Sequence, residues 1–225
     1  AICSSPGQTY TVSVFNPSFR EALGLSHSQL SGAYMLGTLL AAVPLFFIGG
    51  LMDRFGIRRT MAAIVTLFAG ACLLTSQVGS LLQLFAAFFL LRFLGQGSMT
   101  LLSTNTLAMW FHRKLGTVSG LMNLGTAASF AFVPPLVLAL IKLNGWRWTY
   151  AFLGVAVAVL MLPILALLFR NRPEDIGQLI DGDSAPGPDE QDAPSPSRFD
   201  FALPQALRTR SFWILLGASM AWGMI

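Results

Sequence analysis

The decisive stretch of this chain reads Gly49-Gly50-Leu51-Met52-Asp53-Arg54-Phe55-Gly56-Ile57-Arg58-Arg59. It joins two apolar runs, Leu30–Met52 and Thr60–Gln77, which contain no charged residue. Because a helix needs about 20 apolar residues to cross the hydrocarbon core of a bilayer, each run is long enough to span a membrane. The charged turn between them is therefore predicted to lie at a membrane face.

The composition of the chain is that of a polytopic membrane protein. Of its 225 residues, 54% are hydrophobic and 11% are charged, and the mean hydropathy is +0.65, values far from those of a soluble domain. The apolar runs predict six spans and the start of a seventh. They are Ala1–Phe15, Leu30–Met52, Thr60–Gln77, Leu81–Phe111, Gly116–Ile141, Trp148–Phe169 and Phe212–Ile225. The first run lacks an initiating methionine and the last is short for a span, so we expect sequence to be missing at both ends.

Basic residues favour one set of alternating loops, and Lys and Arg near span ends favour the cytoplasm. The favoured loops hold Arg54, Arg58, Arg59, Arg113, Lys114, Arg170, Arg172, Arg198, Arg208 and Arg210, and the others hold Arg20, Lys142 and Arg147. This bias predicts a multi-pass protein of the plasma (inner) membrane with the charged turn in the cytoplasm. The net charge of +4 reflects the same bias, so no nucleic-acid partner is expected.

A change in composition after the sixth run predicts a linker. Residues 170–210 hold most of the acidic residues together with a stretch rich in Pro, Ser, Gly and Asp. Such a segment buries too little apolar surface to offset its ordering entropy, so we expect a partly disordered cytoplasmic linker. It would separate a six-helix transmembrane bundle at 1–169 from the start of a seventh span at 211–225. The end of the linker, Phe199–Arg210, has the pattern of a short helix on the inner membrane face, or it is simply solvated.

Two segments of the chain repeat each other. Phe55–Ala62 leads into the third run and Asn144–Ala151 into the sixth, and the two match in register at Gly, Arg, Thr and Ala. They fall on opposite predicted membrane faces, which is the arrangement expected of an inverted repeat of three helices plus three helices. The alternative is a chance similarity between two helix starts of the Gly-turn-Arg kind.

These motifs together resemble those of the major facilitator superfamily. Gly49–Arg59 resembles its cytoplasmic loop motif, Arg92–Gly97 its fourth-span motif, and Gly145–Trp148 the start of its sixth span. Asn171–Gly177 and Arg208–Trp213 resemble the linker ends of the monocarboxylate-porter and oxalate/formate-antiporter branches. The resemblance implies an all-α membrane protein of two six-helix bundles. This chain would hold the first bundle, the central linker and the start of the second bundle, whose remainder is a missing partner.

The resemblance also implies a gate at the charged loop. In the family, the loop holds the two bundles together on the inner side when the transporter faces outward. The predicted gate residues are Gly49, Asp53, Arg54, Gly56, Arg58 and Arg59. Asp53 would take part in a charge network that forms in one access state and breaks in the other. The alternative is that the arginines serve only to retain the loop in the cytoplasm.

Arg92 is the only charged side chain deep within a predicted span. Placing an arginine at the centre of a bilayer costs roughly 2.5–3.5 kcal/mol even on the lenient insertion scale, so it must face protein or water. Counted in α-helical steps, Arg92, Gln96 and the polar residues Thr100 and Ser103 fall along one face. Arg92 is predicted either to attract an anionic substrate or take part in proton coupling, or to be a structural arginine bonded to carbonyls of a neighbouring span.

Further polar residues within the apolar runs are candidates for the wall of a substrate pathway. With Arg92 and Gln96, the substrate or coupling candidates are Gln8, Thr9, Tyr10, Tyr34, Asn123 and Thr126. The family resemblance places spans one, two, four and five around the central pathway, where these residues fall. Each of them could instead form a hydrogen bond between helices.

The sequence therefore predicts a secondary transporter of a small organic solute, such as a carboxylate, working by alternating access, with a proton as a possible symported partner. No predicted span holds Asp or Glu, so proton coupling through a carboxylate within these spans is not supported. The alternatives are a sensor or scaffold that does not transport, or a transporter of another solute class. An enzyme, a cofactor and a metal are not expected, because the chain lacks metal-ligand spacing, paired intramembrane acids and a phosphate loop.

Overall fold

The computed structural model describes residues 2–167, 169–170, 208–210 and 213–214. The chain divides into two units, Ala1–Ser184 and Ala185–Ile225, and nearly all of the described residues lie in the first unit. The predicted linker and the start of the seventh span fall almost wholly outside the described residues. Their predicted boundaries therefore stay predictions, and the fold described below is that of the first unit.

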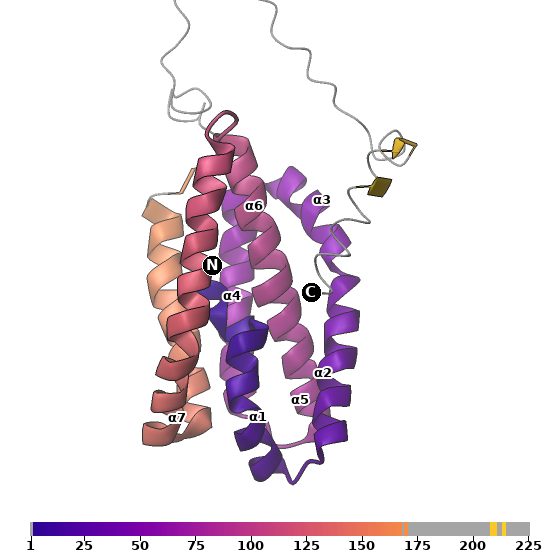
Figure 1. Cartoon of the computed structure of the whole chain (residues 1–225), viewed down its shortest axis with the longest axis vertical. Coiled ribbons are helices and arrows are strands. Elements are labelled where there is room, and N and C mark those ends of the chain that lie inside the picture. The colour runs from indigo at the N-terminus through magenta and orange to yellow at the C-terminus, as the bar shows by residue number, and fades with distance from the viewer. Residues whose placement is uncertain (1, 168, 171–207, 211–212, 215–225) are drawn as a thin grey trace, which may run out of the picture. The chain divides into compact units, whose positions relative to one another are not determined.

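The described part of the first unit consists of helices joined by short turns (Figure 1). In chain order they are η1 (Ile2–Gly7), α1 (Thr9–Leu23), α2 (His27–Ala42), α3 (Leu45–Phe55), α4 (Ile57–Ser76), α5 (Leu81–Leu90), η2 (Leu91–Ser98), α6 (Met99–Trp110) and α7 (Leu115–Leu167). The short η1 is a 3₁₀-helix, whereas η2 is a π-helix that continues α5 into α6. The all-helical fold that the sequence predicts is confirmed.

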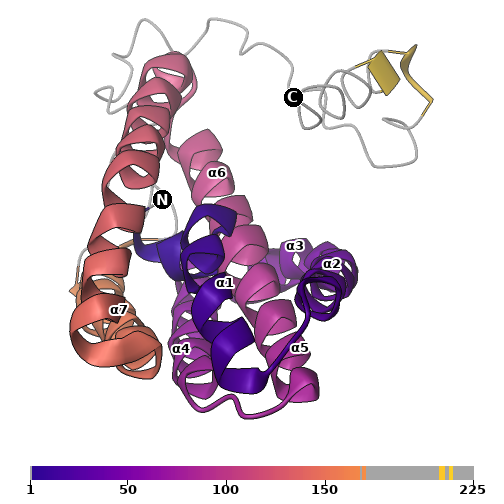
Figure 2. The same cartoon turned by 60° about the horizontal axis from the view of Figure 1, so that its bottom comes forward.

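Most of the predicted spans are recovered as helices of membrane-crossing length. Three helical stretches of the described residues are long and apolar enough to cross a bilayer, namely α4, Leu81–Trp110 and α7. Together α2 and α3, bent by 40° at their junction, are also long and apolar enough. The 53 residues of α7 are two helices merged across Gly145, which has non-helical backbone angles. Figures 1 and 2 show α7 turning back on itself part-way along its length, so it supplies the fifth and the sixth predicted spans.

The first predicted span differs from the structure in its position. The apolar run Ala1–Phe15 contains η1 and only the first half of α1, which continues to Leu23. The 15 residues of α1 are fewer than a full membrane crossing requires. The helix ends where Gly24 adopts a left-handed conformation with φ 62° and its N–H bonds to the Arg20 carbonyl. Hydropathy marks the apolar residues, whereas this glycine decides where the helix ends.

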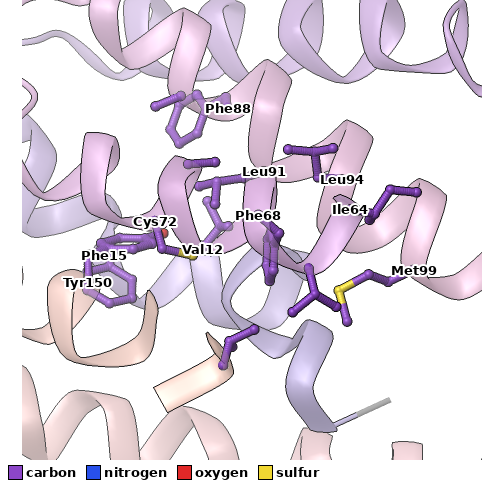
Figure 3. Close-up of a cluster of buried hydrophobic side chains, with 14 of the residues drawn as sticks. Val12, Phe15, Ile64, Phe68, Cys72, Phe88, Leu91, Leu94, Met99 and Tyr150 are labelled. Carbon is purple, nitrogen blue, oxygen red and sulfur yellow. The ribbon is translucent and has the colours of Figure 1, made fainter. Parts of the chain in front are cut away.

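Buried aromatic side chains form the centre of the bundle (Figure 3). Phe15 and Phe19 of α1 contact Tyr150 of α7, with ring centroids 4.0 Å and 5.9 Å apart. Phe19 also meets the edge of Phe88 of α5 at 5.9 Å. Aromatic pairs in these geometries contribute about 0.5–1.5 kcal/mol each beyond the area they bury. The cluster therefore fixes α1 against both α5 and the second half of α7.

The sequence repeat has a matching local structure in both of its copies. Gly56 and Gly145 adopt nearly the same backbone angles, φ 80° with ψ 154° and φ 81° with ψ 163°. In each copy a buried threonine follows, and its hydroxyl donates to the glycine carbonyl: Thr60 to Gly56 at 2.9 Å and Thr149 to Gly145 at 2.8 Å. Chance similarity of sequence would not require this agreement, so the structure supports an inverted repeat.

The two glycines at the starts of the repeats are expected to tolerate no side chain. Their backbone region is accessible almost only to glycine, and a residue forced into it costs about 1–3 kcal/mol. We therefore expect Gly145→Ala to lower the Tm of the purified protein by roughly 5 °C. Gly70→Ala is the matched control, because Gly70 lies within α4 and a Cβ there would meet no atom within 4 Å. Equal Tm values for the two variants would contradict the prediction.

Candidate functional site

Arg92 is held by side chains from two other helices. Its Nε donates a hydrogen bond to Thr38 Oγ1 at 3.1 Å, and its Nη1 donates to Thr9 Oγ1 at 2.9 Å. The guanidinium carbon lies 5.0 Å from the centroid of the Tyr34 ring, within the range of a cation–π contact. The arginine of η2 is thereby fixed against α1 and α2.

The hydroxyls around Arg92 are themselves oriented by neighbours. Thr38 Oγ1 donates to the Tyr34 carbonyl at 2.8 Å, which leaves its lone pairs for Arg92. Thr9 Oγ1 accepts from the Tyr34 hydroxyl at 3.3 Å and donates to Gln96 Oε1 at 3.4 Å. We call Thr9, Tyr34, Thr38, Arg92 and Gln96 the arginine cluster. Because each hydroxyl proton points away from the cation, the cluster supports a charged guanidinium.

Among the described residues, no carboxylate lies beside the positive charge of the arginine cluster. Within the part of the chain that the structure describes, the acidic residues are Glu21 and Asp53, and neither forms an ion pair with Arg92. Arg92 is half-buried, so its charge is partly removed from water. A cation in such a place is stabilised by hydrogen-bonding groups or by an anion, and its two recorded bonds use only part of the donors that a guanidinium has.

Gln96 borders three cavities, and two of them are also lined by other predicted pathway residues. The smaller of these two, of about 290 Å³, is lined by Arg92 and Thr38 together with small and apolar residues of α2, α3 and η2. The larger has a volume of about 570 Å³. It is lined by Cys3, Ser4, Gln8, Tyr10, Met61, Gln96, Met99, Thr100, Ser103, Met122, Gly125, Thr126 and Met161. The lining therefore combines polar side chains of several helices with four methionines.

Most of the residues predicted for the pathway lie at these cavities. The arginine cluster contains four of them, and Gln8, Tyr10 and Thr126 line the larger cavity. Gln8 donates to Ser4 Oγ at 3.2 Å, and the Tyr10 hydroxyl lies 2.9 Å from Ser5 Oγ. Asn123 is exposed and lines none of the cavities described here. Whether these residues contact a substrate stays a prediction.

Thr38 is the member of the cluster that the sequence reading missed. It lies four residues after Tyr34, so both side chains project from the same face of α2. This four-residue spacing from Tyr34 is the feature of the sequence from which Thr38 could have been predicted. Both recorded bonds of Arg92 are to side-chain hydroxyls, whereas the structural alternative for Arg92 required backbone carbonyls of a neighbouring span.

The polar face predicted from Arg92 to Ser103 spans two cavities. Gln96, Thr100 and Ser103 line the larger cavity, and Gln96 also borders the smaller one together with Arg92. The α-helical steps of the prediction do not hold throughout, because Leu91–Ser98 is π-helical and a π turn bonds a residue to the one five positions back. Whether these four residues act as one face of a substrate pathway stays a prediction.

The residues of the charged loop separate into an outer and an inner group. Asp53, Arg54 and Arg59 are exposed, and the guanidinium of Arg54 lies 5.4 Å from the Phe55 ring. Arg58 instead turns inward and donates to the carbonyls of Leu165 and Ala166 in the last turn of α7. Carbonyls in a last helical turn have no partner within the helix, so a cation there is favourable.

The second copy of the repeat makes the reciprocal contact. Arg147, which corresponds to Arg58, donates from Nη1 to the carbonyl of Ser76 at 3.1 Å, and Ser76 is the last residue of α4. The guanidinium of Arg147 also lies 4.4 Å from the centroid of the Trp146 ring. Each arginine at the start of one helix thus caps the end of the other. Arg58 therefore joins α4 to α7 within this unit, a role that the gate prediction did not include.

The reciprocal contacts predict a crosswise effect on helix stability. Arg58→Gln should increase amide hydrogen exchange at the end of α7, and Arg147→Gln at the end of α4, each by about tenfold because a charged hydrogen bond contributes about 1.5–3 kcal/mol. The measurement is hydrogen-exchange mass spectrometry of the purified variants. Arg59→Gln, an exposed neighbour, is the control and should change neither end. Exchange that rises only near the substituted residue would contradict the crosswise contacts.

Comparison with known proteins agrees with this architecture. Residues 1–225 match the Major Facilitator Superfamily as a family. The chain is similar to the "Probable sulfoacetate transporter SauU" of Cupriavidus necator, with 27% identity over 164 residues that cover 72% of this chain and 38% of that protein. It is also similar to the "Oxalate:formate antiporter" of Oxalobacter formigenes, with 24% identity over 220 residues that cover 95% of this chain and 48% of that protein.

A further relative is the "Probable L-galactonate transporter" of Escherichia coli K12, with 25% identity over 166 residues that cover 72% of this chain and 36% of that protein. The chain spans about half the length of these curated relatives, or less.

Proposed function

This chain belongs to the Major Facilitator Superfamily, and from that premise we propose that it is the N-terminal half of a secondary transporter of a small organic anion. The proposed transporter has a second six-helix bundle that follows this chain. It lies in the plasma (inner) membrane with the loop around Asp53 in the cytoplasm. Rocking of the two bundles about a site near the midplane would expose the anion to each side in turn.

The observation that carries this proposal is the arginine cluster. Arg92 keeps a positive charge within a membrane-spanning helix, and no described residue supplies a negative charge beside it. An anionic substrate would supply that charge. The planar guanidinium fork matches a carboxylate or a sulfonate, because two parallel N–H donors can bind two oxygens.

The named relatives favour the same substrate class. Sulfoacetate, galactonate, oxalate and formate, which appear in the names of the three relatives above, are all small organic anions. Identity of 24–27% is too low to carry one of these substrates over to this chain. The proposal therefore names the class and leaves the individual anion to experiment.

The neighbours of Arg92 have distinct parts in this proposal. Thr9 and Thr38 hold the guanidinium, the Tyr34 hydroxyl orients Thr9, and Gln96, which borders both cavities, carries an amide NH₂ that can donate to an anion. Since the carboxylates of the described helices, Glu21 and Asp53, both lie near helix ends, a coupled proton would be carried by the second bundle or by the substrate's own carboxylate.

Transport by the complete protein tests the proposal. Proteoliposomes containing the complete protein would be given a panel of labelled carboxylates, sulfonates, sugars and amino acids, with and without an imposed pH gradient. We expect accumulation of at least one organic anion and of no neutral sugar. Accumulation of a neutral solute alone would reject the anion class, and no uptake across the panel would favour a sensor that binds without transport.

A further inference from the structure

The π-helix η2 is stabilised by a side chain as well as by its backbone. Ser98 Oγ donates to the carbonyl of Phe93, five residues back, at 2.8 Å. The N–H of Met99 bonds to the carbonyl of Leu94, which is also five residues back. Ser98 is fully buried, so water does not compete for its hydroxyl. The serine therefore bonds across the widened turn that follows Arg92.

The other buried serine of comparable geometry bonds differently. Ser129 of α7 is 3% exposed, and its hydroxyl donates to the carbonyl of Gly125, four residues back, at 2.8 Å. This is the usual back-bond of serine in an α-helix. Both serines are buried and both hydrogen bonds are 2.8 Å long. They differ in how far back the hydroxyl reaches: Ser98 bonds five residues back and Ser129 bonds four residues back. Ser98 favours a π turn where Ser129 favours an α turn.

Close packing fixes the part of η2 that follows the arginine. A Cβ placed on Gly95 would lie 2.5 Å from Phe68 Cε2 and 3.1 Å from Gly7 Cα, and one placed on Gly97 would lie 2.6 Å from Leu45 Cδ2. These two residues therefore pack against α4, η1 and α3 with no room for a side chain. We expect a return of the turn to α-helical register to be taken up before Gly95, where it would rotate Arg92 away from Thr9 and Thr38.

We propose that Ser98 is a positioning residue for anion binding, because its hydroxyl holds the π turn that directs the Arg92 guanidinium toward Thr9 and Thr38. This inference rests on the proposed function of Arg92. Ser98 is fully buried and lines none of the cavities that Gln96 borders, so any effect on the anion would pass through the arginine. Misplacement of a binding group by about 1 Å can cost up to about a hundredfold in function.

The test compares variants at Ser98 and Ser129 in the complete protein. Uptake of the anion found by the panel would give KM and Vmax for each variant. Ser98→Ala should raise KM about tenfold, with Vmax within about twofold, because binding geometry is lost while the rocking motion is kept. Ser98→Thr, which retains the hydroxyl, should restore KM, and Ser129→Ala should leave both constants unchanged. If Ser98→Ala does not fold, Ser98→Cys replaces it, since a thiol is a weak donor of similar size.

A double-mutant cycle with Arg92→Gln separates this inference from the function on which it rests. If Ser98 acts through Arg92, Ser98→Ala adds no further rise in KM to Arg92→Gln. An additive effect, or equal KM values for Ser98→Ala and Ser129→Ala, would overturn the role of Ser98 while leaving the role of Arg92 intact. Normal uptake by Arg92→Gln would instead reject the proposed function itself.

Discussion

Arg92→Gln in the complete protein is expected to lower kcat/KM for anion uptake by about 100-fold, because removing the charged partner of a partly desolvated anion costs about 2–5 kcal/mol. The glutamine keeps a polar side chain of moderate length but removes both the charge and the fork. This substitution has the largest expected effect among these predictions, because Arg92 is the only cation among the five described residues of the arginine cluster. Uptake into proteoliposomes at a series of substrate concentrations gives the constants.

Two further substitutions separate the charge of Arg92 from its geometry. Arg92→Lys keeps the charge and loses the bidentate fork, so uptake should fall between wild type and Arg92→Gln. Thr38→Val removes the acceptor of the 3.1 Å bond to Nε and should raise KM about tenfold, as one charged hydrogen bond would. Unchanged kinetics in Arg92→Gln, with an unchanged Tm, would reject both the substrate role and the coupling role of Arg92.

Asp53→Asn is expected to slow uptake about tenfold while the protein still inserts and folds, because a charge-assisted contact worth about 1–3 kcal/mol would be lost in one access state only. Asp53 is exposed at the end of α3, and no hydrogen bond or ion pair joins it to the other residues that the structure describes. Its carboxylate therefore contributes little to the stability of this bundle. We propose that its partner lies in the second bundle.

The matched control for Asp53→Asn is Glu21→Gln. Glu21 is the other acidic residue in the described part of the chain, and it is exposed near the end of α1. Both variants should give a normal yield of folded protein in the membrane, measured by size-exclusion chromatography of a fluorescent fusion. Wild-type uptake by Asp53→Asn would remove the gate role, and the loop would then serve only to set topology.

The class of protein and the positions of its spans could be predicted from residue order. Uncharged runs of membrane-spanning length are a local property, and they mark α2 to α7 to within a few residues. The inverted repeat could also be predicted, since Gly56 and Gly145 are the residues that permit the shared positive φ. Membership of the Major Facilitator Superfamily confirms this part of the reading.

The arginine cluster could be predicted only in part. Arg92, Thr9 and Tyr34 stand out because polar residues are costly in a membrane span, so their types alone identify them. Their residue types do not show which of them meet in the fold. Arg92 bonds to Thr9, which is 83 positions away in the sequence, and Tyr34 bonds to Thr9, which is 25 positions away. Thr38 was missed because a threonine in a span is equally well explained by a local bond to its own helix, which it also makes.

What the sequence determined by itself was the helical membrane fold, its segment lengths and the residues that are expensive to bury, because these depend on composition within one turn or one span. Only the tertiary structure decided the register of η2, the inward turn of Arg58 and the reciprocal contact of Arg147. Within η2, Gly95 and Gly97 pack closely against other helices. The two arginine contacts join residues 107 and 71 positions apart. No local period in the sequence records such contacts, so the direction in which each arginine points is a property of the folded bundle.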